Sequence, residues 1–399
     1  MRLRVHLPLA ILLFCACPQS GNNSFYTPPA PLPAGQPGDV IRSRASVYTL
    51  DPVAGTPVPG VWSRQVLYLS ESALGEANAV SGTVLVPTAP WSGPGQRPLI
   101  SYAVGTRGVG DACAPSKTLS TGTDYEGLFI QALLDRGWAV AISDYEGLGT
   151  PGMHTYVVGQ SEGRAVLDMA RAAQRLAGSG LGASTPVALM GYSQGGGAAG
   201  WAGELAPGYA PELNLKAVVA GGVPGDLLAT AEFVDGGPFV ALELLAALGL
   251  DAAYPELDLE DYLDADGEAL VAEASNTCLA SFDGVGDLFS TLFASRSDFT
   301  HTDPLAAPAW QARLDENRLG SSAPAVPVFQ FHAVLDEMVP FGQAADLRRD
   351  WCDQGANVTW TPLVVAEHVL GMVEGQPLAL AFLASRFAGL PALGNCWLP

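Results

Sequence analysis

The sequence predicts an α/β protein with a mainly parallel central sheet, helices on both faces and an inserted helical cap. Short apolar runs alternate with helical patterns along most of the chain, which is typical of strands joined by crossover helices. An apolar run, a sharp turn and a small-residue helix pattern follow one another at residues 186–205. This alternation is interrupted at residues 226–300, where only helical patterns remain.

The composition is that of a globular protein that can bury a large core. The chain has 399 residues, of which 48% are hydrophobic and 15% are charged. Forty acidic residues against 19 basic ones give a net charge of −21. This excess of negative charge argues against binding to nucleic acid or to an anionic membrane surface.

The first 17 residues have the pattern of a targeting segment. Arg2 and Arg4 form a basic start, and the apolar run at residues 7–16 is too short to span a bilayer. No other stretch is long and apolar enough to be a transmembrane segment. We therefore predict a signal peptide over residues 1–17 and a secreted or extracytoplasmic protein.

Residues 13–17, Leu-Phe-Cys-Ala-Cys, resemble a bacterial lipobox, although Phe14 stands where leucine is usual. Cleavage after Ala16 would leave Cys17 at the new N-terminus, so Cys17 is a candidate for lipid attachment in a membrane-anchored lipoprotein. Ordinary signal cleavage is the alternative. Residues 18–38 are rich in Pro, Gly, Ser and Asn and are predicted to be a flexible linker.

Four cysteines remain in the exported chain, where an oxidising compartment favours disulfides. They are Cys113, Cys278, Cys352 and Cys396, which allow three pairings. Cys352 and Cys396 both lie in the C-terminal part, which favours the pairs Cys352–Cys396 and Cys113–Cys278. Zinc binding is the alternative, but no Cys-x-x-Cys spacing supports it, and we expect no metal site.

The elements of the core follow from β-branched and apolar runs and from helical spacing. The first four strands are separated by Gly and Pro and are expected to form an antiparallel start of the sheet. Strands are predicted at residues 43–50, 62–70, 80–86, 99–104, 138–143, 186–190, 215–220, 326–331 and 358–365. Helices are predicted at residues 125–136, 163–176, 196–205, 343–353 and 378–387. The core therefore comprises residues 39–225 and 301–399.

Residues 226–300 differ in composition from the rest of the chain. They contain 16 acidic residues and a single basic one, Arg296, and residues 239–250 and 285–293 are almost wholly apolar. Because they lack strand periodicity, they are predicted to be helices inserted into the sheet domain. Helices with an apolar side that are inserted near the candidate nucleophile Ser193, described below, favour a cap, or lid, over a lipophilic pocket. A packing or dimerisation appendage is the alternative.

Ser193 lies at the centre of the strand–turn–helix segment. The sequence Gly191-Tyr192-Ser193-Gln194-Gly195 follows the apolar run directly. A Gly-x-Ser-x-Gly turn in this context crowds the backbone, so that glycines are needed on both sides and the serine Oγ is held above the sheet. The context therefore favours a nucleophile over an ordinary Gly/Ser loop.

A serine nucleophile needs an imidazole that takes its proton and a carboxylate that orients the imidazole. Of the five histidines, His6 lies in the signal, and His154 precedes the serine, which is the wrong chain order for this kind of turn. His332 ends a predicted strand and is expected in the core, and His301 is expected to cap a turn at the cap junction. His368 follows a predicted strand at the carboxyl edge of the sheet and is the predicted base.

Asp336 is the predicted acid. It follows the strand at residues 326–331 and precedes a Val-Pro pair that starts the next helix. The 32 positions from Asp336 to His368 accommodate one helix and one strand. Glu337 is the competitor, since adjacent side chains point in different directions and only one of them can face the histidine.

Two backbone amides are expected to bind the oxyanion of a tetrahedral intermediate. Gln194, directly after the nucleophile, offers one amide at a helix N-terminus, where the helix dipole also favours negative charge. The second amide is expected in the loop that follows the strand at residues 99–104. We assign it to Thr106.

Five motifs occur in a fixed order along the chain. They are Gly105-Thr106-Arg107-Gly108-Val109-Gly110-Asp111-Ala112-Cys113-Ala114-Pro115-Ser116, Asp144-Tyr145-Glu146-Gly147-Leu148-Gly149, Gly191-Tyr192-Ser193-Gln194-Gly195-Gly196, Asp336-Glu337-Met338-Val339-Pro340 and Glu367-His368. Together they resemble the signatures of the secretory lipase family, the lipase A type of fungi and its bacterial relatives. The similarity covers about residues 40–399.

The resemblance implies an α/β-hydrolase fold with a helical cap inserted before the strand that leads to the acid. It also implies ester hydrolysis by the serine, aspartate and histidine assigned above, and a disulfide from Cys113 into the cap. The sequence departs from the family pattern at two positions. Val104 stands where bacterial members often carry His before the Gly-Thr pair, and His332 stands where a small residue is usual.

These inferences predict a secreted serine ester hydrolase, a lipase or carboxylesterase that cleaves acylglycerols or short-to-medium acyl esters through an acyl-enzyme. Its expected partner is a small-molecule ester or lipid, and no metal or organic cofactor is needed. An α/β-hydrolase peptidase is the nearest alternative, because the acidic cap could bind a substrate amine. A non-catalytic binding protein on the same fold is the other, although such a protein would be expected to lose triad residues.

Overall fold

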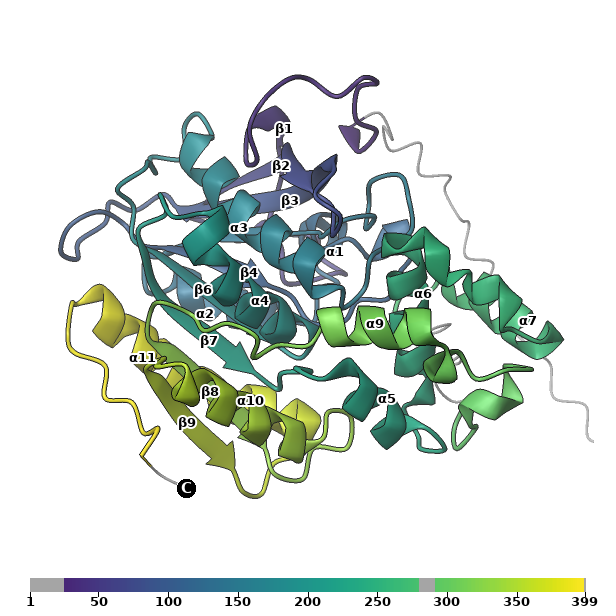
Figure 1. Cartoon of the computed structure of the whole chain (residues 1–399). Coiled ribbons are helices and arrows are strands. Elements are labelled where there is room, and N and C mark those ends of the chain that lie inside the picture. The colour runs from purple at the N-terminus through teal and green to yellow at the C-terminus, as the bar shows by residue number, and fades with distance from the viewer. Residues whose placement is uncertain (1–24, 280–290, 398–399) are drawn as a thin grey trace, which may run out of the picture.

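Residues 25–279 and 291–397 are described by the computed structural model of the chain (Figure 1). The predicted signal peptide with Cys17, residues 18–24 of the predicted linker and the apolar residues 285–290 lie outside the described residues. Within the described ranges, no helix combines the length and the apolar character that a membrane span requires.

A nine-stranded sheet forms the centre of the protein, with its strands in the order β1-β2-β3-β5-β4-β6-β7-β8-β9. The strands are Val40–Ala45 (β1), Val61–Glu71 (β2), Ala77–Pro87 (β3), Leu99–Ala103 (β4), Ala139–Ser143 (β5), Val187–Tyr192 (β6), Leu215–Gly221 (β7), Val328–Ala333 (β8) and Val358–Leu363 (β9). The pairs β1/β2, β2/β3 and β3/β5 are antiparallel, and the other five pairs are parallel. The predicted mainly parallel sheet is confirmed, and its first three strands form the predicted antiparallel start. The prediction is wrong for the fourth strand, because β4 lies between β5 and β6 and is parallel to both.

Helices cover both faces of the sheet, which explains why β4, β5, β6 and β8 are buried along their whole length. The core helices are Pro115–Thr121 (α1), Gly127–Leu134 (α2), Gly159–Arg175 (α3), Gln194–Tyr209 (α4), Phe341–Asp353 (α10) and His368–Phe387 (α11), with a 3-10 helix at Asp111–Cys113. α3, α4 and α10 lie on one face, and α2 and α11 on the other (Figure 1). Contacts between neighbours hold each layer: Trp351 of α10 donates to Glu204 of α4 at 2.6 Å, and Gln376 of α11 donates to the carbonyl of Phe129 in α2 at 3.0 Å.

Between β7 and β8 the chain forms an inserted helical region, as the sequence predicts. Its described helices are Leu227–Val234 (α5), Val240–Ala253 (α6), Ala265–Ala274 (α7) and Pro308–Glu316 (α9), with 3-10 helices at Pro255–Leu257, Leu259–Asp261, Arg296–Asp298 and Pro304–Ala306. They gather beyond the end of the sheet to which the β7 arrow points (Figure 1). Together with Ala73, Val109 and residues 156–158 of the sheet domain, they bury a second apolar cluster that is separate from the main core around the sheet. We call this helical region the cap.

The cap extends further along the chain than predicted. Trp310 and Leu314 of α9 are buried in the apolar cluster of the cap together with Leu257. Trp310 Nε1 also donates to the carbonyl of Leu257 at 3.1 Å. The predicted boundary at residue 300 is therefore wrong, because the acidic composition that suggested it ends before the last helix that packs into this cluster.

Part of the predicted flexible linker is attached to the sheet domain. Phe25 and Tyr26 are buried and pack with Leu67 of β2. The hydroxyl of Tyr26 lies 3.0 Å from the hydroxyl of Ser116 at the start of α1. Although Pro and Gly keep this segment irregular, its two aromatic side chains attach it to the sheet domain.

Both predicted disulfides are present in the structure. Cys113–Cys278 joins the loop after β4 to the cap across 165 residues of sequence. Cys352–Cys396 joins the end of α10 to the C-terminal segment across 44 residues. The first disulfide therefore connects the two parts of the molecule, and the second fastens its C-terminus.

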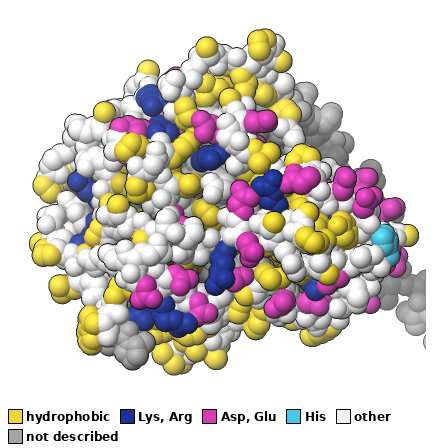
Figure 2. All heavy atoms as spheres, in the orientation of Figure 1, with side chains coloured by type: hydrophobic (Ala, Val, Ile, Leu, Met, Phe, Trp, Pro, Cys, Tyr) yellow, Lys and Arg dark blue, Asp and Glu magenta, His cyan; other side chains and the backbone are white. Residues whose placement is uncertain are grey.

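Acidic side chains are frequent over the cap on the face shown in Figure 2, where they are drawn in magenta on the right-hand side. This agrees with the 16 acidic residues and one basic residue at positions 226–300. Because like charges repel, this side of the molecule disfavours the approach of anionic surfaces.

Candidate active site

Ser193 occupies the sharp turn between β6 and α4. Its backbone has φ 59° and ψ −126°, a strained conformation that occurs where a strand-to-helix turn exposes a nucleophile. Glycine is required on both sides of it. A Cβ at Gly191 would collide with the carbonyl of Gly195, and a Cβ at Gly195 would collide with the carbonyl of Ala103. The local sequence thus permits a turn in which the serine stays partly exposed above a buried strand.

The structure brings Ser193, His368 and Asp336 into one chain of hydrogen bonds. Ser193 Oγ lies 3.0 Å from His368 Nε2, and His368 Nδ1 lies 2.7 Å from Asp336 Oδ2. The three residues follow the carboxyl ends of β6, β9 and β8, the edge at which open α/β sheets place their sites. When Nδ1–H donates to the carboxylate, Nε2 carries a lone pair that can accept the serine proton. This is the geometry of a nucleophile, a base and an orienting acid.

His368 is held through its backbone as well as through its ring. It is the first residue of α11, whereas the sequence predicted it in a loop, and the carboxylate of Glu367 caps this helix. The hydroxyl of Tyr192 donates to the carbonyl of His368 at 2.6 Å, and the His368 N–H donates to Glu337 at 3.1 Å. Glu337, the competitor in the sequence, therefore contacts the backbone of the histidine, and Asp336 contacts its ring.

Asp336 is buried, and its second oxygen is also satisfied. Oδ1 accepts hydrogen bonds from the backbone amides of Met338 at 3.0 Å and Val339 at 2.7 Å. Burial alone would raise the pKa of Asp336, but the hydrogen bond and charge of His368 outweigh it and hold the pKa below its ordinary value. The carboxylate is therefore ionised at neutral pH and can stabilise a positively charged imidazole.

His332 lies beneath the acid, in the core position that the sequence predicts. It is fully buried, its Nε2 lies 2.9 Å from the carbonyl of Val339, and the same nitrogen lies 3.3 Å from Asp336 Oδ2. Burial lowers the pKa of His332, which keeps its ring neutral. His301 lies in an exposed cap turn, where its ring contacts the hydroxyl of Thr302 at 3.0 Å.

A buried polar cluster behind the nucleophile was not apparent from the sequence. Gln194 Nε2 donates to Glu162 Oε1 at 2.6 Å and lies 3.0 Å from His154 Nε2. Glu162 also accepts the amide of Val157 at 2.9 Å. Burial raises the pKa of Glu162 to about 8 and lowers that of His154 to about 4, so both side chains are neutral near pH 7. His154 thus anchors Gln194 and lies outside the triad, as its chain order indicated.

The two predicted oxyanion residues lie at the same edge of the sheet. Ala103 of β4 pairs with Gly191 of the neighbouring strand β6. Thr106 comes three residues after Ala103, and Gln194 comes three residues after Gly191. Gln194 is the first residue of α4, so its amide has no acceptor within the helix. Thr106 is buried, and its hydroxyl lies 2.7 Å from that of Tyr156.

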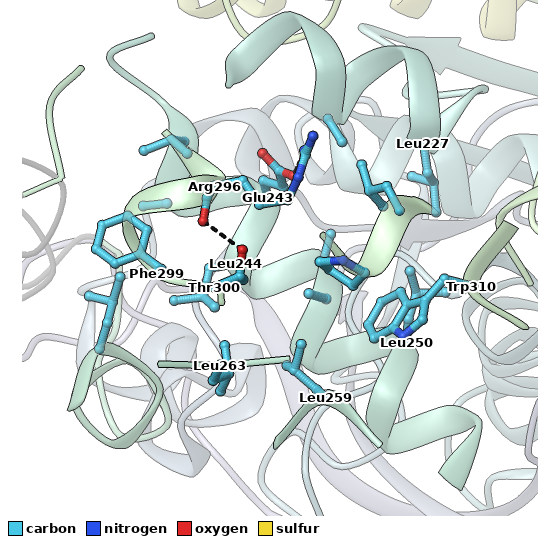
Figure 3. Close-up of a pocket in the computed structure, with 18 of the residues that line it drawn as sticks. Leu227, Glu243, Leu244, Leu250, Leu259, Leu263, Arg296, Phe299, Thr300 and Trp310 are labelled. Atoms are coloured by element: carbon cyan, nitrogen blue, oxygen red, sulfur yellow. Dashed lines mark hydrogen bonds and ion pairs between the residues drawn. The ribbon is translucent and has the colours of Figure 1, made fainter. Parts of the chain in front are cut away.

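An apolar pocket opens at Ser193 between the core and the cap. Its apolar lining includes Tyr156, Val157, Leu227, Val234, Leu242 and Met338. A second, almost wholly apolar cavity lies inside the cap (Figure 3) and shares wall residues of α5 and α6 with the first. Within the described residues, no three His, Cys, Asp or Glu side chains are grouped so that they could hold a metal ion. The surroundings of Ser193 therefore suit a lipophilic chain.

Known proteins share this architecture. The family model described as secretory lipase matches residues 113–395. Lipase 4 of Candida albicans is 31% identical over 396 residues, which cover 94% of this chain and 83% of the relative. The chain belongs to the secretory lipase family. It is therefore an ester hydrolase of the lipase type.

A solved structure of the same kind is that of lipase A from Candida antarctica in its closed state. It superposes with a TM-score of 0.81 at 29% identity, covering 93% of this chain and 87% of that one. The predicted α/β-hydrolase fold is thereby confirmed. Another relative, from Mycobacterium tuberculosis, is named a probable inactive lipase and is 32% identical over 384 residues, covering 93% of this chain and 83% of the relative.

Proposed function

We propose that this secretory lipase hydrolyses carboxylic esters with Ser193 as the nucleophile, His368 as the general base and acid, and Asp336 as the orienting carboxylate. The observation that carries the proposal is the unbroken chain of contacts, 3.0 Å from Ser193 Oγ to His368 Nε2 and 2.7 Å from His368 Nδ1 to Asp336 Oδ2. A serine hydroxyl is a weak nucleophile on its own, and a hydrogen-bonded base is what activates it.

In the acylation step, Ser193 Oγ attacks the ester carbonyl while His368 Nε2 takes the hydroxyl proton. The imidazolium then gives this proton to the oxygen of the leaving alcohol, and the carbon–oxygen bond of the ester breaks. In deacylation, water attacks the acyl-serine, His368 takes a proton from the water and returns it to Ser193 Oγ, and the carboxylic acid leaves. Asp336 keeps the ring in the required tautomer throughout.

Both tetrahedral intermediates carry a negative oxygen that needs hydrogen-bond donors. We assign the backbone amides of Gln194 and Thr106 to this role. The position of Gln194 at the start of α4 supports the assignment, because a helix N-terminus carries partial positive charge. Removal of one such donor typically lowers kcat by about 10²–10³.

Acylglycerols and short-to-medium acyl esters are the proposed substrates. The apolar lining of the Ser193 pocket supports this class, since an alkyl chain gains about 0.8 kcal/mol for each methylene group that it buries. The continuation of apolar wall into the cap cavity (Figure 3) supports chains longer than acetate.

The protein acts outside the cytoplasm, as its membership of a secretory family and its two disulfides indicate. We propose in addition that Cys17 becomes the lipidated N-terminus of the mature chain. Mass spectrometry of the membrane fraction should then find a diacylglyceryl group on Cys17, and a Cys17→Ser variant should appear in the soluble fraction. An unmodified N-terminus in the wild type would refute the anchor and leave the esterase proposal untouched.

The esterase proposal is tested by comparing wild type with Ser193→Ala on p-nitrophenyl butyrate. Loss of the nucleophile is expected to lower kcat by about 10⁶, while the exposed control Ser184→Ala should match the wild type. Retained activity in Ser193→Ala would overturn the triad. Faster turnover of an aminoacyl-p-nitroanilide than of the ester by the wild type would instead favour a peptidase, and inactivity on both would favour a binding protein.

A further inference from the structure

Three successive peptide groups of the oxyanion loop have side-chain partners. The amide of Gly105 donates to Glu126 Oε1 at 2.9 Å, and the carbonyl of Gly105 accepts from Arg107 Nη1 at 3.1 Å. The carbonyl of Thr106 accepts from the hydroxyl of Tyr125 at 2.9 Å. The backbone on both sides of the Thr106 amide is thus fixed by hydrogen bonds, all of them from Arg107 or from residues at the start of α2.

The contact from Arg107 bears directly on the direction of the Thr106 N–H. The carbonyl of Gly105 and the amide of Thr106 belong to one planar trans peptide group, in which C=O and N–H point in opposite directions. A guanidinium that holds this carbonyl therefore sets the direction of the N–H. It also polarises the peptide group, which makes the N–H a stronger hydrogen-bond donor.

Arg107 is itself anchored in a buried cluster. Its Nη2 lies 2.9 Å from Asp124 Oδ1, its Nη1 lies 3.3 Å from Glu126 Oε1, and its guanidinium lies 3.8 Å from the centre of the Tyr125 ring. The side chains of Arg107, Asp124 and Glu126 are all at least 96% buried. Burial raises the pKa of Glu126 above its ordinary value, although the charge of Arg107 opposes this rise.

Gly105 is matched to this cluster. A Cβ at this position would lie 2.9 Å from Glu126 Oε1 and 3.0 Å from the hydroxyl of Tyr125, closer than a side chain tolerates. The absence of a side chain lets both groups reach the loop backbone. The loop backbone at Gly105 and the side chains of Tyr125 and Glu126, which precede α2, therefore pack directly against each other.

A buried charge cluster of this kind is poorly explained by stability alone. Burying ions carries a desolvation cost that their attraction often only balances, and well-packed apolar groups can serve as well. Here the side chains of Arg107, Tyr125 and Glu126 direct their hydrogen bonds to the backbone of Gly105 and Thr106, on both sides of one amide. Its position points to a role in the reaction.

We propose that Arg107 and Glu126 are positioning residues that aim the Thr106 amide at the oxyanion. They touch no reacting atom and act through the backbone of residues 105–106. This inference rests on the proposed function, because it assigns a task to the oxyanion hole of that reaction. It predicts that weakening the cluster destabilises the transition state more than the bound ester.

The test compares Glu126→Gln with the matched control Glu204→Gln. Glu204 is also a buried glutamate that accepts a backbone amide, from Gly320 at 2.8 Å, but it lies in the contact between α4 and α10. With p-nitrophenyl butyrate, Glu126→Gln is expected to lower kcat by about 10- to 10²-fold, because small displacements of a catalytic group have effects of this size. KM should change by less than about 3-fold, since ester binding relies on the apolar pocket. Glu204→Gln should keep the wild-type kcat.

A second readout separates positioning from general damage. Butaneboronic acid forms a tetrahedral adduct with the serine and mimics the intermediate, so its inhibition constant should rise in Glu126→Gln by the same factor by which kcat/KM falls. If the Glu126→Gln protein does not fold, Tyr125→Phe provides the test. This substitution removes the hydrogen bond to the Thr106 carbonyl and leaves the partly exposed ring in place. It should lower kcat by about 3- to 10-fold.

Wild-type kcat and unchanged boronate affinity in these variants would overturn the inference. So would a loss of activity that the Glu204→Gln control shares. The failure of the proposed function has a different signature, because it would appear as retained esterase activity in Ser193→Ala. An inactive Ser193→Ala together with a fully active Glu126→Gln would reject the positioning role alone.

Discussion

The core side and the cap side of the Ser193 pocket are held together by different forces. On the core side, His368, Asp336 and the oxyanion loop are fixed by hydrogen bonds of defined direction. On the cap side, the wall consists mainly of apolar side chains of α5 and α6. Glu243 is an exception in this wall, where it is ion-paired with Arg296, and burial raises its pKa to about 7.

This difference indicates that the two sides of the pocket in the secretory lipase have different roles, one in positioning the reacting atoms and the other in accommodating the ester. Hydrogen bonds are directional, and they weaken steeply with distance and angle, so the core side can hold reacting atoms in place. Apolar contacts are non-directional, so the cap side can fit chains of different shape. Substitutions on the core side should therefore slow the turnover of every ester, and substitutions on the cap side should change the choice between esters.

The strongest test of the core side is Asp336→Asn. The amide keeps the size of the side chain, and its oxygen is expected to stay with the backbone amides of Met338 and Val339. Its NH2 group then faces His368 Nδ1 and favours the wrong tautomer, so kcat should fall by about 10⁴ for short and long esters alike. Steady-state kinetics on C2, C4 and C8 p-nitrophenyl esters would measure it. The control Glu337→Gln retains an oxygen for the His368 amide and should lose less than about 3-fold. Equal losses in both variants would contradict the assignment of the acid.

The disulfides test the connection between the two sides. By the chain-entropy relation, Cys113–Cys278 stabilises the fold by about 5 kcal/mol and Cys352–Cys396 by about 4 kcal/mol, because the first closes the longer loop. Replacing either pair by alanines should lower the melting temperature measured by calorimetry.

Only the loss of the first disulfide should also lower kcat/KM. The carbonyl of Arg107, in the oxyanion loop, accepts the amide of Leu279, which follows Cys278 in the cap. The second disulfide lies at the end of α10, away from the catalytic edge. An activity loss confined to the Cys352/Cys396 variant would contradict this connection.

Glu162→Gln tests the buried cluster behind the nucleophile through the pH dependence of stability. The pKa of Glu162 is raised to about 8 in the folded state and lies near 4.3 when unfolded, so its contribution is fully present at low pH and is lost as the pH rises to about 8. Glutamine removes this loss and can keep the contacts to Gln194 and Val157. At pH 9 the variant should be more stable than the wild type by about 2–4 kcal/mol, with little difference at pH 4.

Urea unfolding at pH 4, 7 and 9 would measure this difference. The wild type should lose stability with rising pH more steeply than the variant. Parallel pH profiles for the two proteins would show that Glu162 ionises normally in the folded state.

Ala246→Phe tests the cap side and has the smallest expected effect. Ala246 lines both the Ser193 pocket and the cap cavity, so a larger side chain should reduce the space for an acyl chain in both. The ratio of kcat/KM for C8 over C2 esters should fall by about 10-fold, a typical effect for the loss of one or two buried methylene groups. Equal changes for both chain lengths would show that the cap acts on the chemistry as well.

Local sequence determined most of the sheet and the elbow. The strands β5, β6 and β7 are largely apolar runs, and they begin or end within two residues of the predicted positions. The elbow was predictable because steric crowding at Ser193 demands glycine at fixed neighbouring positions. The order of serine, acid and base along the chain then predicted Asp336 and His368, and the structure places both within hydrogen-bond distance of each other.

Other features depend on packing between segments that are distant in sequence. α1, at Pro115–Thr121, is polar and has no apolar stripe that would reveal a helix. The start of α11 depends on the capping carboxylate of Glu367, although the preceding valines favour a strand. The contacts of Glu126 with Gly105 and of Glu162 with Gln194 join separate elements, so neither residue has a local pattern that distinguishes it from a surface glutamate.

Covalent labelling tests the central role of Ser193 most directly. An activated p-nitrophenyl alkylphosphonate reacts with a serine only where a base and an oxyanion hole assist, so it reports on the assembled site. Tandem mass spectrometry of the inactivated protein should find one phosphonate per chain on Ser193, with labelling abolished in Ser193→Ala and strongly slowed in His368→Ala. Complete inactivation with the label on another residue, or with Ser193 unmodified, would contradict the account.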